Sequence, residues 1–185
     1  MMRRLHRADA ILVVIDVQEK LIPVIHRNEE LQRNIDHLVR GCHILRVPSI
    51  LTEQYVKGLG PTTTAVREAF EQTVGYAPIE KMCFSSMGCE AFIARLRERE
   101  RQQVLVAGIE THVCVWQTVI DLLDADFAVT VIADAVSSRT EENRQIALRR
   151  MEREGARLSS TEMALFEMCV MSGTDEFRAI SKLVK

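Results

Sequence analysis

The chain has 185 residues, of which 47% are hydrophobic and 27% charged, and its formal net charge at pH 7 is −2. This length and composition are typical of one globular domain with a full core, so residues 1–185 are expected to form a single domain. The slightly acidic balance argues against nucleic acid as a partner, because proteins that bind a phosphate backbone carry an excess of basic residues.

The N-terminal segment and the cysteines predict a cytoplasmic protein. The basic start of the chain is followed by a short apolar stretch, Ala10–Ile15, that lacks the small-residue cleavage site of a signal peptide. No apolar run approaches the length that crosses a bilayer, so no membrane partner is expected. The five cysteines form no C-x-x-C pair, which argues against a disulfide framework and a zinc site and favours a reducing compartment.

Short β-rich segments alternate with helical patterns along the chain, which is typical of βαβ units on a parallel sheet. Strands are predicted at Ala10–Asp16, Pro48–Thr52, Ile79–Met82, Val104–Gly108, Phe127–Ala133 and Ala156–Ser159. A long amphipathic helix after the first strand is indicated by apolar residues three and four apart, namely Leu31, Ile35, Leu38, Cys42 and Leu45. Further helices are predicted at Met87–Arg99, His112–Asp124, Thr140–Glu154, Thr161–Cys169 and Asp175–Val184. The segment Thr52–Pro61 is expected to be a loop, either a plain turn or a mobile cover over the site.

Three chemically suggestive residues lie at the predicted carboxyl ends of strands, where open α/β sheets bind their ligands. They are Asp16, Lys81 and Cys114. Each also has a purely structural interpretation: Asp16 as a cap for the next segment, Lys81 as a solvated side chain, and Cys114 as a small buried hydrophobe. Thr111 is expected to be the N-cap of the following helix, which places Cys114 in the first helical turn. There the helix dipole is expected to lower the pKa of the thiol.

Together these residues form a recognisable chemical unit. A thiolate is the nucleophile for acyl transfer, a carboxylate can accept and return the proton, and an ammonium can stabilise both anions. The main-chain N–H groups of Glu110 and Cys114 are the expected oxyanion hole, because the start of a helix leaves such donors unpaired.

The chain resembles the isochorismatase-like, or cysteine hydrolase, superfamily over nearly its whole length. The matching stretches are Leu12–Gln18, the Lys81 segment with Phe84 and Ser85, and Gly108–Cys114. The resemblance implies a three-layer αβα fold with a six-stranded parallel sheet, a catalytic triad of Asp16, Lys81 and Cys114, and a homo-oligomer. It also implies a cis peptide bond between Ile109 and Glu110.

The departures from the superfamily pattern narrow the chemistry. Nicotinamidases carry an Asp and two His after the second strand to bind a metal, whereas this chain has Glu53, Gln54 and Tyr55 there. A metal is therefore not expected, and the lack of a G-x-G-x-x-G or P-loop motif argues against a nucleotide cofactor. Isochorismatases that cleave a vinyl ether lack a cysteine at the nucleophile position, so Cys114 indicates an amide, carbamoyl or ester bond. His112 is interpreted as a surface or packing residue.

Four residues are candidate contacts for a small-molecule substrate: Gln18, Gln54, Phe84 and Trp116. Gln18 could orient a substrate amide or cap a helix, and the two aromatic residues could instead belong to the core.

The prediction is thus a cytoplasmic, metal-independent hydrolase of a small amide or carbamoyl compound that acts through a thioester on Cys114. Two alternatives stay open. One is a thiol redox or peroxide-responsive protein, although Cys83 and Cys89 lie on other segments and neither is an obvious resolving cysteine. The other is a catalytically silent member of the family that serves as a scaffold.

Overall fold

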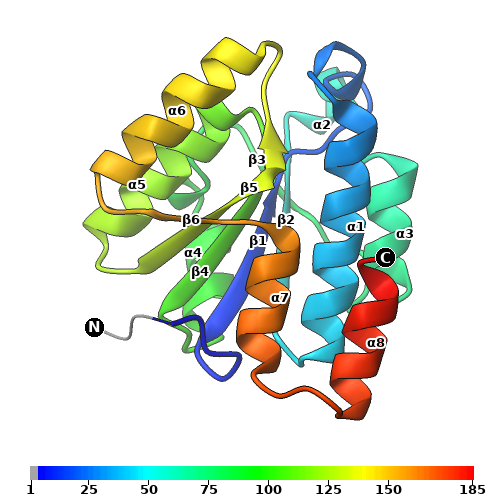
Figure 1. The fold of residues 1–185 in the computed structure, drawn as a ribbon. Helices are drawn as coiled ribbons and strands as arrows, with labels where there is room; N and C mark the ends of the chain where they lie inside the picture. The colour runs from blue at the N-terminus through cyan, green and yellow to red at the C-terminus, as the bar shows by residue number, and fades with distance from the viewer. Residues whose placement is uncertain (1–3) are drawn as a thin grey trace.

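The computed structural model describes residues 4–185 and contains a six-stranded sheet in which every strand pair is parallel (Figure 1). The strands are β1 (Ala10–Ile15), β2 (Ser49–Gln54), β3 (Ile79–Lys81), β4 (Gln103–Ile109), β5 (Ala128–Ser137) and β6 (Arg157–Ser159). Their order across the sheet is β3-β2-β1-β4-β5-β6. The predicted α/β class and six-stranded parallel sheet are confirmed.

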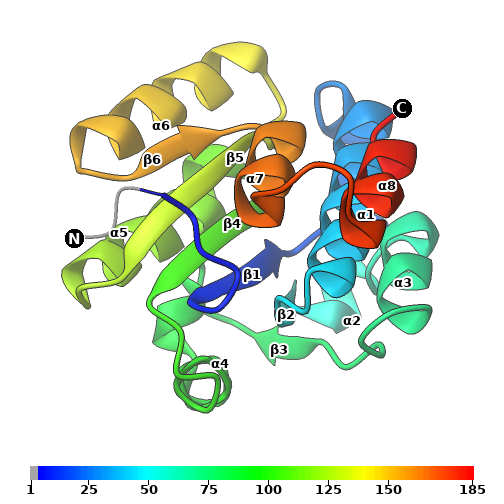
Figure 2. The same ribbon diagram turned by 60° about the horizontal axis from the view of Figure 1, so that its bottom comes forward.

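Helices cover both faces of the sheet and complete three layers (Figure 2). On one face α1 (Asn28–Ile44) packs against α3 (Thr64–Glu71), α7 (Thr161–Cys169) and α8 (Asp175–Leu183). The helices of the other face are α4 (Glu90–Arg97), α5 (Trp116–Asp124) and α6 (Glu141–Arg153). One further short helix, α2 (Val56–Leu59), follows β2.

Strand β1 shows why the central strands read as continuous apolar runs. All six of its side chains are buried. Ala10, Leu12 and Val14 join the core under α1, whereas the alternate residues Ile11, Val13 and Ile15 join the core under α5 and α6. Because successive side chains of a strand point to opposite faces, a strand between two helical layers needs apolar residues at every position.

The strand order places the topological switch point between β1 and β4. The chain proceeds outward from β1 through β2 to β3 and then returns to the other side of β1 as β4. In register, Ile15 at the end of β1 lies opposite Gly108 of β4. Ligands of open α/β sheets bind at the carboxyl edge beside such a point.

The region between β2 and β3 differs from the prediction, which had no helix there. The structure contains α2 and the eight-residue α3, whose Val66, Ala69 and Phe70 are buried against the α1 layer. A helix this short has only three core positions, and its periodicity is correspondingly weak.

Other predicted boundaries shift by a few residues. Strand β5 continues to Ser137, four residues beyond the predicted end, because its pairing with β4 resumes after a register shift. Helix α4 is shorter than predicted and follows a 3-10 turn, Ser86–Gly88. The predicted helix His112–Asp124 begins instead as a π-helical turn, Thr111–Val115, which leads into α5.

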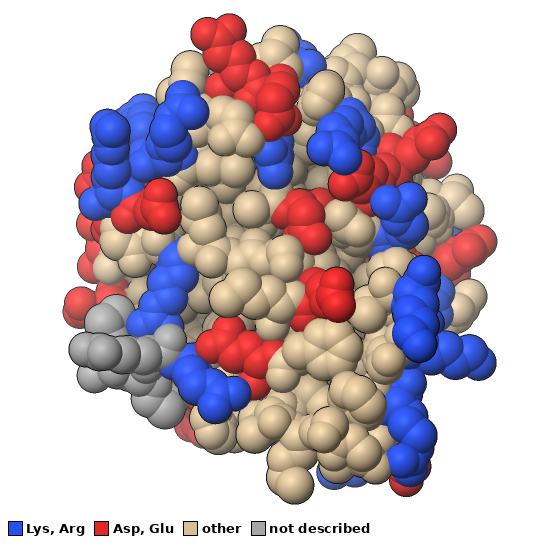
Figure 3. All heavy atoms as spheres, viewed as in Figure 1, with Lys and Arg blue, Asp and Glu red and all other residues tan. Residues whose placement is uncertain are grey.

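The surface carries interspersed charges. Figure 3 shows lysine and arginine side chains beside aspartate and glutamate on the face viewed, with an uncharged area between them. Within residues 4–185, none of the helices has the length and apolar character needed to span a bilayer.

Candidate active site

The structure brings the three candidate residues together at the carboxyl edge of the sheet. Asp16 directly follows β1 and adopts a positive φ of 54°. Lys81 is the last residue of β3, and Cys114 lies in the π-helical turn after β4. Segments that are far apart in the sequence thus converge because parallel strands end at one edge.

Asp16 and Lys81 form a buried ion pair. The Lys81 Nζ atom lies 2.6 Å from Asp16 Oδ2, and both side chains are 0% exposed. The other carboxylate oxygen, Oδ1, accepts a hydrogen bond of 2.7 Å from the Thr52 hydroxyl. Burial raises the pKa of Asp16 above its ordinary value, although Lys81 and Thr52 act in the opposite direction. The carboxyl group therefore holds a proton more readily than an exposed aspartate does.

The ammonium of Lys81 is surrounded by acceptors. Besides Asp16, its Nζ donates to Gln54 Oε1 at 3.0 Å, to the Phe84 carbonyl at 3.0 Å and to the Cys83 carbonyl at 3.2 Å. An ammonium has three hydrogens, so these four acceptors exceed what it can supply. Lys81 is thereby held in one position, with its charge directed at Asp16.

The Cys114 thiol lies beside this pair and is 8% exposed. Its Sγ atom is 3.5 Å from Gln54 Oε1, and the carboxylate of Asp16 lies close enough to interact with it electrostatically. Burial, followed by the negative charge of Asp16, raises the pKa of Cys114 to about 12, although Lys81 lowers it. The predicted lowering of this pKa is therefore wrong: the desolvation of the thiol and a nearby carboxylate outweigh the helix dipole.

The expected N-cap at Thr111 is also wrong. Glu110 occupies the position before the turn, and no side chain caps it. Instead the Val115 N–H reaches the Glu110 carbonyl at 3.2 Å, which closes the π-helical turn. The hydroxyl of Thr111 is buried and has no hydrogen-bond partner among residues 4–185. The peptide bond between Ile109 and Glu110 is cis.

Gln18 is used by the main chain. Its amide nitrogen donates to the carbonyls of Gln54 and Gly60 at 2.9 and 2.6 Å, and its oxygen accepts from the Gln54 N–H at 2.8 Å. Both amide hydrogens are taken, so none is left for a substrate. Neither predicted role, substrate contact or helix cap, fits these bonds: Gln18 ties the end of β2 to the loop that follows α2.

The two aromatic candidates lie in different environments. Phe84 is 53% exposed just beyond β3, so its alternative interpretation as a core residue is wrong. Trp116, at the start of α5, is covered by the guanidinium of Arg150 from α6, which lies 4.0 Å from the ring centroid. The ring of Trp116 thus takes part in a contact between α5 and α6.

Glu53, adjacent to Gln54, points to the opposite face of β2. One oxygen of its buried carboxylate accepts hydrogen bonds from the N–H and hydroxyl of Thr62 and from the Tyr76 hydroxyl. In the described part of the chain, no three His, Cys, Asp or Glu side chains gather as metal ligands. Metal independence stays a prediction.

Sequence reasoning missed a charged pair at this edge. Arg139 donates to both carboxylate oxygens of Glu110, at 2.9 and 3.3 Å. Next to it, the hydroxyl of Ser138 lies 3.0 Å from Nδ1 of His112, which agrees with the interpretation of His112 as a packing residue. Because β5 was predicted to end at Ala133, nothing in the sequence placed Ser138 and Arg139 at the carboxyl edge.

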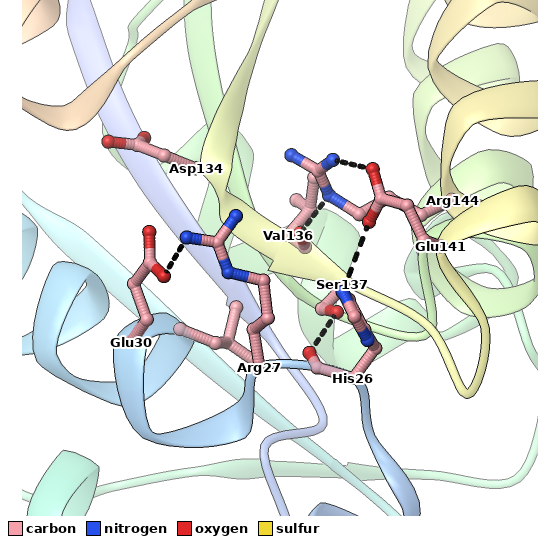
Figure 4. A pocket seen from close by; sticks show the side chains of 9 residues that line it. His26, Arg27, Glu30, Asp134, Val136, Ser137, Glu141 and Arg144 are labelled. Atoms are coloured by element: carbon pink, nitrogen blue, oxygen red, sulfur yellow. Dashed lines mark hydrogen bonds and ion pairs between the residues drawn. The ribbon is translucent and has the colours of Figure 1, made fainter.

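A small pocket lies between the start of α1 and the end of β5 (Figure 4). Its volume is about 70 Å³, which is room for a few water molecules. Most charged side chains that line it pair with one another, Arg27 with Glu30 and Glu141 with both His26 and Arg144, while Asp134 accepts hydrogen bonds from Thr161. The pocket is therefore a poorer candidate for the substrate site than the region around Cys114.

Comparison with known proteins agrees with this fold. The sequence matches the isochorismatase domain family over residues 10–163. It is 37% identical over 183 residues to the secreted isochorismatase effector Isc1 of Phytophthora sojae, covering 98% of this chain and 87% of the effector.

Two solved structures are similar in shape. The MAR1 ribonuclease of Caenorhabditis elegans superposes with a TM-score of 0.90 at 36% identity, covering 98% of this chain and 92% of the ribonuclease. YcaC of Escherichia coli, described as an octameric hydrolase of unknown specificity, superposes with a TM-score of 0.90 at 23% identity, covering 99% and 90% of the two chains. Since the family match spans most of the sequence and the effector aligns over almost all of it, the chain belongs to the isochorismatase family of hydrolases.

Proposed function

We propose that the chain is a cysteine hydrolase of a small amide or carbamoyl compound, with Asp16, Lys81 and Cys114 as its catalytic residues. The observation that carries the proposal is the fully buried pair of Asp16 and Lys81 with the Cys114 thiol beside it, close enough for both charges to act on the thiol. A buried ion pair contributes little net stability, because desolvation offsets the attraction between the charges. Perturbed titratable groups that meet at the ligand-binding edge of a sheet are instead typical of catalytic sites.

In the first half of the reaction, Cys114 attacks the substrate. The thiol proton passes to Asp16 as Sγ bonds to the carbonyl carbon, and the C=O electron pair moves to oxygen. The raised pKa of Asp16 favours this transfer, because a base accepts a proton best from a group of similar pKa. The N–H groups of Glu110 and Cys114 would donate to the oxyanion.

Collapse of the tetrahedral intermediate breaks the C–N bond, and Asp16 delivers its proton to the leaving nitrogen. The product of this step is a thioester on Cys114. Water then attacks the thioester carbonyl and gives its proton to Asp16, which returns one proton to the departing sulfur. Lys81 keeps its protons throughout and stabilises the carboxylate whenever Asp16 is ionised.

The charges around Cys114 favour a neutral substrate. The carboxylates of Asp16 and Glu110 both raise the pKa of the thiol, which means that they repel negative charge at Sγ. An amide or carbamoyl group is neutral, whereas a phosphodiester is an anion. The similar C. elegans protein is called a ribonuclease, so RNA belongs among the compounds to be tested.

We further propose that residues 1–185 act as one domain within a homo-oligomer in the cytoplasm. The octamer described for E. coli YcaC supports the oligomer. All five cysteines are free thiols, which suits a reducing compartment. The P. sojae relative is described as secreted, so fractionation of cells is the direct test of location.

The test is a panel of small primary amides and carbamoyl compounds, with an RNA oligonucleotide as a further arm. Ammonia release is measured together with the intact mass of the protein after acid quenching. The expected result is turnover and an acyl adduct on Cys114 in the parent and in the control Cys169→Ala, which removes a buried thiol of α7, but neither in Cys114→Ala. Turnover by Cys114→Ala near the parent rate contradicts the mechanism.

Two other results would replace the proposal. RNA cleavage without amide hydrolysis would assign a nuclease activity instead. A disulfide between Cys114 and Cys83 or Cys89 after peroxide treatment, without turnover of any amide, would favour the redox alternative. Absence of turnover, adduct and disulfide alike would favour a silent scaffold.

A further inference from the structure

The side-chain amide of Gln54 lies between the ammonium of Lys81 and the thiol of Cys114. Its Oε1 atom is 3.0 Å from Lys81 Nζ and 3.5 Å from Cys114 Sγ, while its Nε2 atom donates to the carbonyl of Met82 at 3.0 Å. Gln54 and Lys81 are also direct neighbours across strands β2 and β3. The same face of β2 carries Thr52, which donates to Asp16.

The orientation of this amide is determined by its neighbours. The Met82 carbonyl can only accept a hydrogen bond, and the Lys81 ammonium can only donate one. The nitrogen of Gln54 must therefore face Met82, and its oxygen must face Lys81 and Cys114. The main chain of Gln54 is fixed as well, since Gln18 binds both its N–H and its carbonyl.

Lys81 does not depend on the oxygen of Gln54. The three hydrogens of the ammonium are already matched by Asp16 Oδ2 and the carbonyls of Cys83 and Phe84. The Gln54 oxygen is thus a surplus acceptor for Lys81, and the thiol hydrogen of Cys114 is the other donor within its reach.

We infer that Gln54 is a positioning residue that holds the thiol hydrogen of Cys114 and so keeps the nucleophile neutral between turnovers. A carbonyl oxygen accepts a hydrogen bond from S–H but faces a thiolate with its own partial negative charge, so it stabilises only the protonated form. The inference deepens the proposed function and rests on it in taking Cys114 as the nucleophile.

Three charged groups also face the thiol, and they act on it in opposite directions. Asp16, after β1, and Glu110, after β4, favour the thiol form, whereas Lys81, at the end of β3, favours the thiolate. Asp16 must receive the proton during catalysis, so an acceptor that is not a base can hold the hydrogen without consuming the catalytic carboxylate.

Two substitutions of Gln54 by side chains of nearly the same length test the inference in opposite directions. Gln54→Met removes the acceptor and should lower the pKa of Cys114 by about one unit, which makes alkylation by iodoacetamide at pH 8 about tenfold faster. Gln54→Glu puts a carboxylate there and should make alkylation at least about tenfold slower. The rate is followed at Cys114 by peptide mass spectrometry over a pH series, in the full-length protein.

The matched control is Gln117→Met, which makes the same exchange on the exposed side of α5 and should alkylate like the parent. If Gln54 served only to hold the fold together, the alkylation rate of Cys114 would change in the same direction in both variants, or not at all. Slower alkylation of Gln54→Met, or equal shifts in the two variants, overturns the inference. The alkylation needs no turnover, so its outcome is separate from that of the hydrolysis assay: hydrolysis by Cys114→Ala would refute the proposed function while leaving this titration readable.

Discussion

At the scale of single residues, the charges of Asp16 and Lys81 compensate each other, because both side chains are completely buried and neither is solvated. Removal of one partner leaves a buried charge without compensation, which costs far more than the intact pair contributes. This asymmetry makes the pair visible to measurements of stability as well as of activity.

The first prediction concerns that stability. Lys81→Met should lower the free energy of unfolding by about 3–5 kcal/mol, because the Asp16 carboxylate is left buried and unpaired. Urea denaturation followed by circular dichroism measures the loss. The control is Lys57→Met at an exposed position of α2, where a change of less than about 0.5 kcal/mol is expected. Equal effects of the two substitutions would show that the pair is not buried as described.

The second prediction separates charge from proton transfer at Cys114. The negative charge of Asp16 raises the pKa of the thiol and the positive charge of Lys81 lowers it. Asp16→Asn should therefore lower this pKa and speed alkylation at a fixed pH, whereas Lys81→Met should raise the pKa and slow alkylation. Hydrolysis should collapse in both variants. Asp16→Asn removes the group that protonates the leaving nitrogen, and Lys81→Met removes the charge that stabilises the ionised carboxylate.

The pH profile of iodoacetamide alkylation is the measurement for this prediction. The parent should react slowly at neutral pH and faster as the pH rises towards the raised pKa of about 12. Slower alkylation in Asp16→Asn, or no response to either change, would mean that the three residues do not share a site.

At the scale of secondary-structure elements, the main chains of β1 and β4 approach each other closely just before the residues of the site. Gly108 has a φ of 115°, and a Cβ atom there would lie 2.1 Å from the main-chain oxygen of Ile15. Only glycine satisfies both the conformation and the spacing. The close approach brings the turn that carries Cys114 to the end of β1, where Asp16 follows.

The third prediction follows from this contact. Gly108→Ala should destabilise the protein by about 2–4 kcal/mol and reduce turnover even where the fold survives, because β4 must move away from β1 and carry Cys114 with it. Thermal denaturation and amide hydrolysis together measure the effect. Gly155→Ala is the control: its φ is also positive, at 105°, but no atom lies within 4 Å of the added Cβ. A Gly108→Ala protein as active as the control would refute the role of this contact.

The fourth prediction concerns the whole molecule. Exhaustive chelation should change neither the hydrolysis rate nor the unfolding midpoint, and elemental analysis should find no stoichiometric zinc, iron or manganese. The reason is the donor set after β2: Gln54 is neutral, and one oxygen of Glu53 already accepts from Thr62 and Tyr76. Activity that is lost on chelation and restored by one metal would contradict this expectation.

The sequence alone determined the architecture and the positions of the chemically important side chains. A strand buried on both faces must be apolar throughout, as β1 is, and a parallel sheet collects the ends of its strands at one edge. Asp16, Lys81 and Cys114 could therefore be expected at one edge from the local pattern of strands, and the resemblance to the superfamily implied the same triad. The short helix α3 was not predicted, because eight residues show too little periodicity to be distinguished from a loop.

Only the tertiary structure decided the electrostatics of the site. The raised pKa of Cys114 depends on burial and on Asp16, whereas the expected lowering relied on the positive helix start and on Lys81 and left out the desolvation of the thiol. The contacts of Gln54 with Lys81 and Cys114 span 27 and 60 residues, and the pair of Glu110 with Arg139 spans 29. Desolvation and long-range contact are properties of the packed chain, so no local pattern encodes them.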